Sequence, residues 1–205
     1  MRITRIEAQK RRPGRKSIFL DGAFAIGISD ETLLRSGLRT GDSLEPEALK
    51  ELQDLEEVSD ARTSALRLLG RRPRSTKELT DRLRRKQYRE ETINTVILKL
   101  TETGILDDEA FARMYLRDHL TLRPSGGRLL AQKLRRFGID REMIVRVLAD
   151  ALPDETDAAI QAAEKYLRSR STGLEESVVR SRLTAFLARR GFSWETINAT
   201  IEKVL

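Results

Sequence analysis

The chain has 205 residues, of which 39% are hydrophobic, 5% aromatic and 35% charged, and its formal net charge is +7. Because it has no cysteine, disulfides and thiolate metal sites are excluded, and no apolar run reaches the roughly 20 residues of a membrane span. We expect many small helices with solvated faces. The N-terminal sequence lacks the apolar stretch of a signal peptide, so we expect a cytoplasmic protein without membrane contact.

Residues 1–45 have the pattern of a small β module. Short extended runs are separated by two turn signals, Pro13-Gly14 and Asp21-Gly22. The predicted strands are residues 2–9, 16–20 and 23–28. A three-stranded meander needs a helix against its apolar face, and residues 29–37 supply one. Ser29 or Asp30 would cap its start and Gly37 would end it.

A second helical region begins at Pro46, which suits the first turn of a helix, and it extends to Gly70. Its apolar residues keep a spacing of three to four positions throughout. This spacing fits one long helix or two helices broken near Ser59. We interpret residues 46–58 as a connecting helix between the β module and the remainder of the chain.

Three later segments align without a gap at offsets of 51 and 53 residues. They are RLRRKQYREETINTVILKL (82–100), KLRRFGIDREMIVRVLADA (133–151) and FLARRGFSWETINATIEKV (186–204). Apolar positions match, and so does a glutamate that core packing alone would not require. A period near 50 residues predicts a tandem array of one supersecondary unit. We therefore predict a mainly α fold with three three-helix repeats, over 59–106, 107–153 and 154–205, after the small three-stranded β segment.

Capping residues define the helices of each repeat. Ser75 and Glu78 form a capping box for the second helix of repeat one, which should run to about Lys86. In repeats two and three a glycine ends the second helix and a polar residue caps the third. These pairs are Gly138 with Asp140 and Gly191 with Ser193. Repeat one has Gln87 and Arg89 at the corresponding positions, so we expect a looser turn there.

Three consecutive acids, Asp107, Asp108 and Glu109, raise the question of a metal or acid–base site. An Asp N-cap followed by acids in the first turn is typical of a helix start, and successive helical residues diverge by roughly 100°. His119, the only histidine, lies about 16 Å further along the predicted helix at 1.5 Å per residue. We interpret the acids as a helix cap. Together with the absence of phosphate-loop, zinc-protease and nucleophile-elbow motifs, this predicts a non-enzyme without cofactor or metal.

Basic residues are concentrated in two blocks. Residues 1–16 have a net charge of +6 and residues 61–100 one of +8, whereas residues 101–154 balance to zero. Such blocks favour contact with a polyanion or with a protein that itself binds one. The predicted binding residues at the first hairpin tip are Lys10, Arg11, Arg12, Arg15 and Lys16. Those in repeat one are Arg71, Arg72, Arg74, Lys77, Arg84 and Arg85.

Three stretches resemble the RecX regulatory family: RRPRSTKELTDRL (71–83), GILDDEAFARMY (104–115) and GGRLLAQKLRRFGI (126–139). Residues 3–29 are similar to the β extension of many members. The resemblance implies three tandem three-helix repeats, each like a helix-turn-helix domain. It also implies a protein that binds the RecA–single-stranded DNA filament and restrains its assembly, ATP hydrolysis and strand exchange, in homologous recombination, DNA repair and the SOS response. We expect a monomer, with single- or double-stranded DNA as a further direct partner.

Two other classes of function fit the repeats. A tandem helix-turn-helix transcriptional regulator would place the second helix, with Lys77, Arg84 and Arg85, in the DNA major groove. The first two turns of that helix contain no Asn or Gln for paired hydrogen bonds to adenine. A structural adaptor explains the repeats but leaves the basic blocks without a role.

Overall fold

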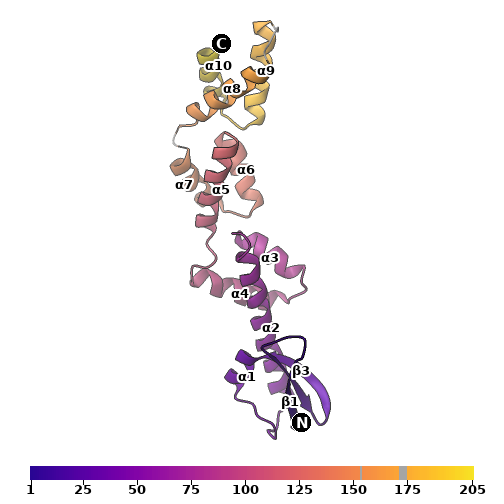
Figure 1. Ribbon diagram of the computed structural model, residues 1–205. Coiled ribbons are helices and arrows are strands. Elements are labelled where there is room, and N and C mark those ends of the chain that lie inside the picture. Colours follow the sequence, from indigo (N-terminus) through magenta and orange to yellow (C-terminus); the bar gives the residue numbers. More distant parts are fainter. Residues whose placement is uncertain (153, 171–174) are drawn as a thin grey trace. The chain divides into compact units, whose positions relative to one another are not determined.

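A computed structural model describes residues 1–152, 154–170 and 175–205. An N-terminal antiparallel sheet is followed by helical bundles, so the fold is mainly α with a three-stranded β segment, as predicted (Figure 1). The chain divides into two compact units. Unit 1 contains residues 1–72 and 79–105, and unit 2 contains residues 73–78 and 106–205. The predicted end of repeat two at Pro153 lies outside the described residues.

The sheet of unit 1 has the strand order β1-β2-β3, with β1 spanning Ile3–Ala8, β2 Arg15–Leu20 and β3 Ala23–Ser29. The β2–β3 turn has positive φ at both Asp21 and Gly22, as a two-residue hairpin requires. One apolar cluster joins the sheet to the segment that follows it. Its buried members are Ile3, Ile18, Leu20, Ile28, Leu44 and Leu52.

Two helices follow the sheet. Helix α1 (Asp30–Ser36) is capped by the Ser29 hydroxyl, which accepts a hydrogen bond from the Thr32 amide at 3.1 Å. Gly37 ends it in the left-handed conformation, as predicted. Helix α2 (Pro46–Leu69) is one continuous helix of 24 residues, which decides between the two alternatives for this region. The predicted limit between residues 58 and 59 therefore falls inside a helix, whose first half packs on the β segment through Leu52.

The second half of α2 forms the first bundle with α3 (Thr76–Arg84) and α4 (Glu90–Glu102). Its buried residues include Ala61, Ala65, Leu79, Leu83, Ile93, Val96 and Leu100. At the α3–α4 turn, Gln87 itself adopts the left-handed conformation, with φ of 65°. Tyr88 Oη lies 2.9 Å from Ser64 Oγ, and the Arg89 guanidinium binds Glu57 and Asp54. The Arg89 side chain does not cap α4, and side chains of α2 contact the turn instead, so its looseness stays a prediction.

Unit 2 contains the second and third bundles. Helices α5 (Asp108–Leu122), α6 (Gly127–Arg136) and α7 (Arg141–Ala151) surround one core, which includes Phe111, Leu116, Leu130, Leu134 and Val147. Helices α8 (Thr156–Arg170), α9 (Glu176–Arg189) and α10 (Trp194–Val204) surround another, which includes Leu183, Leu187, Phe192 and Ile197. The side chains of Asp140 and Ser193 cap α7 and α10, as predicted.

The second and third bundles meet at a backbone joint. The start of α6 docks on the α9–α10 turn, where the Gly126 amide donates to Arg190 O at 3.0 Å and the Arg128 amide donates to Gly191 O at 3.2 Å. Glu155, just before α8, accepts from the Gly127 amide at 2.9 Å. A Cβ at Gly126 would overlap the Gly191 carbonyl oxygen, which explains why the smallest residue occurs there.

Unit 2 has a second joint of the same kind, formed by residues 75–77. Ser75 Oγ donates to Phe137 O in the α6–α7 turn at 2.7 Å, and the Thr76 amide donates to Asp108 Oδ1 at 2.7 Å. A Cβ at Gly138 would lie 2.6 Å from the Lys77 Cβ. In both joints the start of one repeat's second helix docks on the next repeat, and an acid from the next repeat's first helix region accepts its amide.

Candidate functional site

The acidic triplet is a set of structural partners. Asp107 Oδ1 accepts hydrogen bonds from the amides of Glu109 at 2.8 Å and Ala110 at 2.9 Å, which confirms the predicted N-cap. Asp108 accepts the hydrogen bond from the Thr76 amide in the joint described above. Glu109 forms ion pairs with Arg113 and Arg146, and the hydrogen bond from Arg113 is the main reason that its pKa is lowered. Among the described residues, no group of three or more His, Cys, Asp or Glu could hold a metal ion.

The predicted residues of the first hairpin have different environments. Lys10, Arg11 and Arg12 lie in the exposed β1–β2 turn. Lys16 Nζ lies 3.6 Å from an Asp30 carboxylate oxygen. Arg15 points back into unit 1, where its guanidinium forms an ion pair with Glu56 at 2.8 Å.

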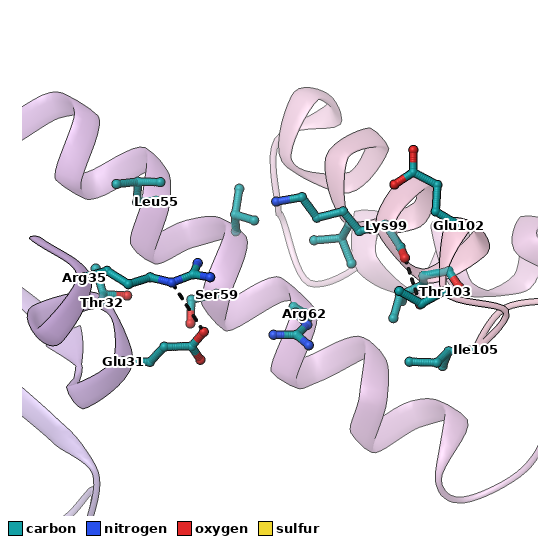
Figure 2. Close-up of a pocket in the computed structure, with 13 residues that line it drawn as sticks. Glu31, Thr32, Arg35, Leu55, Ser59, Arg62, Lys99, Glu102, Thr103 and Ile105 are labelled. Atoms are coloured by element: carbon teal, nitrogen blue, oxygen red, sulfur yellow. Dashed lines mark hydrogen bonds and ion pairs between the residues drawn. The ribbon is translucent and has the colours of Figure 1, made fainter.

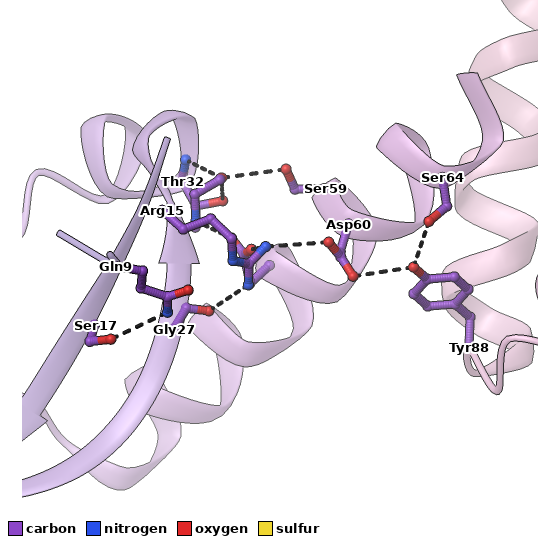
Figure 3. A network of polar contacts seen from close by, with 11 residues as sticks. Gln9, Arg15, Ser17, Gly27, Thr32, Ser59, Asp60, Ser64 and Tyr88 are labelled. Carbon is purple, nitrogen blue, oxygen red and sulfur yellow. Dashed lines mark hydrogen bonds and ion pairs between the residues drawn. The ribbon is translucent and has the colours of Figure 1, made fainter. Parts of the chain in front are cut away.

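Arg15 belongs to a polar network that links the sheet to α2 (Figure 3). It donates to Gly27 O at 2.9 Å and lies 3.3 Å from Asp60, and Asp60 in turn accepts from Tyr88 at the α3–α4 turn. Glu56, only 5% exposed, also accepts from the Ser29 amide. The network gives Arg15 a role in holding the sheet on α2, so the exposed tip that could meet a polyanion reduces to Lys10, Arg11 and Arg12.

The predicted residues of repeat one belong to two units and differ in their exposure. Arg71, Arg72, Arg84 and Arg85 belong to unit 1, whereas Arg74 and Lys77 belong to unit 2. Arg71, Arg72 and Arg85 are exposed, but Arg74 is only 8% exposed, so its side chain is not open to a ligand. The Lys77 stem lies against Gly138 in the joint.

Arg84 is neutralised by its neighbours. Its guanidinium makes a two-pronged contact with the Glu90 carboxylate, at 2.5 and 2.8 Å, and lies 3.7 Å from Asp81. The hydrogen bond with Glu90 raises the pKa of Arg84 and lowers that of Glu90. Of the eleven predicted residues, Lys10, Arg11, Arg12, Arg71 and Arg85 are exposed and make no ion pair in the described part of the chain. Their role in binding stays a prediction.

Unit 1 also has a groove of about 330 Å³ between α1, α2 and α4 (Figure 2). Its apolar lining comes from Leu55, Val58, Val96, Leu100 and Ile105. Its polar lining has both signs of charge, from Arg35, Arg62 and Lys99 and from Glu31 and Glu102. Because acids and bases alternate there, the groove does not favour a polyanion.

A second, strongly basic depression lies in unit 2. Two adjoining hollows lie along the end of α5, α6 and the end of α9 and share Leu129 and Arg189 in their linings; together they are here called the α6–α9 groove. Its charged lining consists of Arg123, Arg128, Lys133, Arg135, Arg189 and Arg190, with His119 at one side. No Asp or Glu lines it among the described residues.

Sequence reasoning missed this groove because it relied on the net charge of blocks. Residues 101–154 balance to zero, but their charges are segregated in space. Glu109 and Asp150 bind Arg113, and Glu109 also binds Arg146, all on α5 and α7. In the part of the chain that the structure describes, the bases of α6 form no ion pair with an acid. The one available signal was GGRLLAQKLRRFGI, in which three bases lie within four residues and no acid precedes Asp140.

Among the described residues, no helix combines the length and apolar character needed to cross a membrane.

Four family models together match nearly the whole chain. They are the regulatory protein RecX N-terminal domain over residues 1–45 and the first, second and third three-helix domains of RecX over 61–100, 107–148 and 153–201.

Full-length relatives and solved structures agree with the models. The regulatory protein RecX of Lacticaseibacillus paracasei is 33% identical over 204 residues, covering 98% of this chain and 84% of the relative. The regulatory protein RecX of Clostridium perfringens is 30% identical, covering 99% of this chain and 96% of the relative. A crystal structure of regulatory protein RecX superposes with a TM-score of 0.81, at 25% identity and 98% coverage of both chains. The RecX structure from Lactobacillus salivarius has the same fold over 73% of this chain, with a TM-score of 0.68.

Proposed function

The chain belongs to the RecX family of regulatory proteins, and we propose that it binds the RecA–single-stranded DNA filament and restrains its assembly, ATP hydrolysis and strand exchange. The observation that carries this proposal is the match to all four RecX domains in order along one chain. The protein acts without catalysis, as a monomer in the cytoplasm.

A non-catalytic role is supported by the structural contacts of the titratable groups, which cap helices, accept backbone amides and form ion pairs. Asp107 caps α5, Asp108 and Glu155 accept amides in the joints, and Glu109 pairs with arginines. His119 stacks on Tyr115 at 5.8 Å between ring centroids and lies 3.3 Å from Ser125 Oγ, a neutral hydroxyl. An acid–base or nucleophilic site would need such groups to converge on a substrate instead of on the backbone and on each other.

The joints argue against the alternative of a tandem helix-turn-helix regulator. A recognition helix reads base edges with residues near its N-terminus, which must be free to enter the major groove. The starts of α3 and α6 are instead covered by backbone contacts with the following repeat, through Ser75 and Gly126. The third helices are no better suited, because each has a glutamate in its first turn, at Glu91, Glu142 and Glu195, which would repel phosphate.

The proposal is tested with purified RecA on circular single-stranded DNA. We expect substoichiometric amounts of the protein to lower the rate of DNA-dependent ATP hydrolysis and to sediment with the filament. A control without RecA measures sedimentation with the DNA alone. If ATP hydrolysis is unchanged and no protein sediments with the filament beyond that control, the proposal is wrong.

A further inference from the structure

The α6–α9 groove concentrates positive charge that the protein itself does not neutralise. Arg123, Arg128, Arg135 and Arg189 are exposed, and in the described residues none of the four makes an ion pair. Some exposed arginines elsewhere have carboxylate partners instead, for example Arg113 with Asp150 at 2.8 Å. Because like charges at close range destabilise a fold, an uncompensated cluster indicates a surface that an anion neutralises.

The inner part of the groove is partly shielded from water. Lys133 and Arg190 are half-buried, and the Arg190 guanidinium lies 5.0 Å above the Phe186 ring while donating to Pro124 O at 2.8 Å. Burial lowers the pKa of Arg190, with Arg123 as the second cause. A guanidinium held in place by a ring and a carbonyl is preorganised, so an incoming anion need not order it.

We propose that the α6–α9 groove binds the phosphate backbone of a single nucleic-acid strand directly, without the recombinase. Arg128, Arg135, Arg189 and Arg123 contact successive phosphates along the groove. Lys133 and Arg190, set deeper, contact a phosphate that a flexible single strand can bring inward. A duplex is a stiff convex cylinder, which reaches the exposed arginines but not these half-buried groups. The site therefore favours a single strand over a duplex.

The joint fixes the two walls of this groove. The backbone hydrogen bonds from Gly126 and Arg128 to the α9–α10 turn hold α6 against the end of α9. The spacing of Arg128 and Arg189 is therefore set by main-chain contacts and not by flexible side chains. This rigidity suits a linear ligand of regular charge spacing, because the walls need no rearrangement before binding.

The test measures the affinity of the full chain for a fluorescent 25-nucleotide oligothymidylate at low salt, without RecA. We expect Arg123→Ala with Arg189→Ala to weaken binding about tenfold, since both side chains are exposed and unpaired. The control is Arg113→Ala with Arg146→Ala, which removes the same net charge from ion-paired positions of the same unit. We expect this control to change affinity less than about twofold. Both variants should keep the wild-type helical circular dichroism.

Three results would overturn the proposal. They are no measurable oligothymidylate binding by the wild type, equal losses in the two double variants, or tighter binding of a duplex of equal length than of the single strand. Because RecA is absent, failure here leaves the proposed filament function standing. Conversely, a protein that binds oligothymidylate through the groove but leaves ATP hydrolysis by RecA unchanged would contradict only the filament function.

Discussion

Repeat one and the α6–α9 groove differ in how their charges are arranged. Residues 61–100 have a net charge of +8, yet Arg84 and Arg89 are bound by Glu90, Glu57 and Asp54. Residues 101–154 have no net charge, yet Arg128, Lys133 and Arg135 of α6 line a groove that has no acid in its described lining. Net charge along the chain therefore does not locate the positive surface. The positive surface lies where the bases have no acids beside them to pair with.

The two regions also differ at the turn between the second and third helices. The α6–α7 and α9–α10 turns each accept the start of a preceding repeat's helix, and glycine is present in both. The α3–α4 turn instead meets side chains of α2, and Gln87 occupies the left-handed position. A docked backbone leaves no room for a Cβ at Gly191, whereas side-chain partners tolerate a larger residue.

The largest effect is expected from Gly191→Ala. Gly191 has φ of 83°, and a Cβ there would overlap the Leu129 backbone nitrogen in the joint. We expect a loss of about 3 kcal/mol or more in the free energy of unfolding of unit 2, from the left-handed conformation together with the overlap. Urea denaturation followed by fluorescence of Trp194, the only tryptophan, measures it. A loss below about 1 kcal/mol would mean that the joint is not rigid.

A smaller loss is expected from Asp108→Ala, which removes the acceptor of the Thr76 amide. We expect a cost of about 1–2 kcal/mol, because that amide is left without its partner in a partly buried joint. Asp108→Asn keeps an acceptor oxygen and serves as the control. Thermal denaturation of both variants decides the matter, and equal melting temperatures for Ala and Asn would show that the hydrogen bond is unimportant.

In repeat one, a substitution at the corresponding turn is expected to raise stability. Gln87→Gly relieves the left-handed strain without disturbing the contacts of Tyr88 and Arg89, so we expect stabilisation of about 0.5–1 kcal/mol. Hydrogen exchange of the α4 amides reports on this bundle directly. Faster exchange in the glycine variant would indicate that the Gln87 side chain makes a stabilising contact.

The smallest effect concerns pH. Burial, followed by the charges of Lys133, Arg123 and Arg190, lowers the pKa of His119 below its usual 6.5. The unfolded chain therefore binds a proton more readily than the folded chain, so the His119 contribution to stability falls as the pH drops below about 6.5. We expect the stability of His119→Gln to fall less than that of the wild type between pH 7.5 and pH 5. Melting temperatures across this range test the sign, and a wild type stabilised relative to the variant at pH 5 would contradict it.

The sequence predicted the β-meander, the repeats and most helix caps because these depend on local patterns. Ser29, Asp107, Asp140 and Ser193 cap the helices to which they were assigned. It could not predict that Asp108 accepts an amide from residue 76, or that Arg15 binds Glu56, since both contacts join distant segments. The groove depends on where α6 meets α9, which periodicity does not encode.

The most direct test of this account compares the salt dependence of oligothymidylate affinity for Arg84→Ala with Arg85→Ala and for Arg123→Ala with Arg189→Ala. Each phosphate contact that is lost lowers the slope of log affinity against log salt by about 0.7 for a single strand. For Arg123→Ala with Arg189→Ala we expect the slope to fall by about 1.4, which corresponds to two lost phosphate contacts. The repeat-one variant should lose at most about 0.7, because Arg84 is already bound by Glu90. An equal or larger loss in repeat one would show that net charge along the chain, and not the placement of unpaired charges, determines binding.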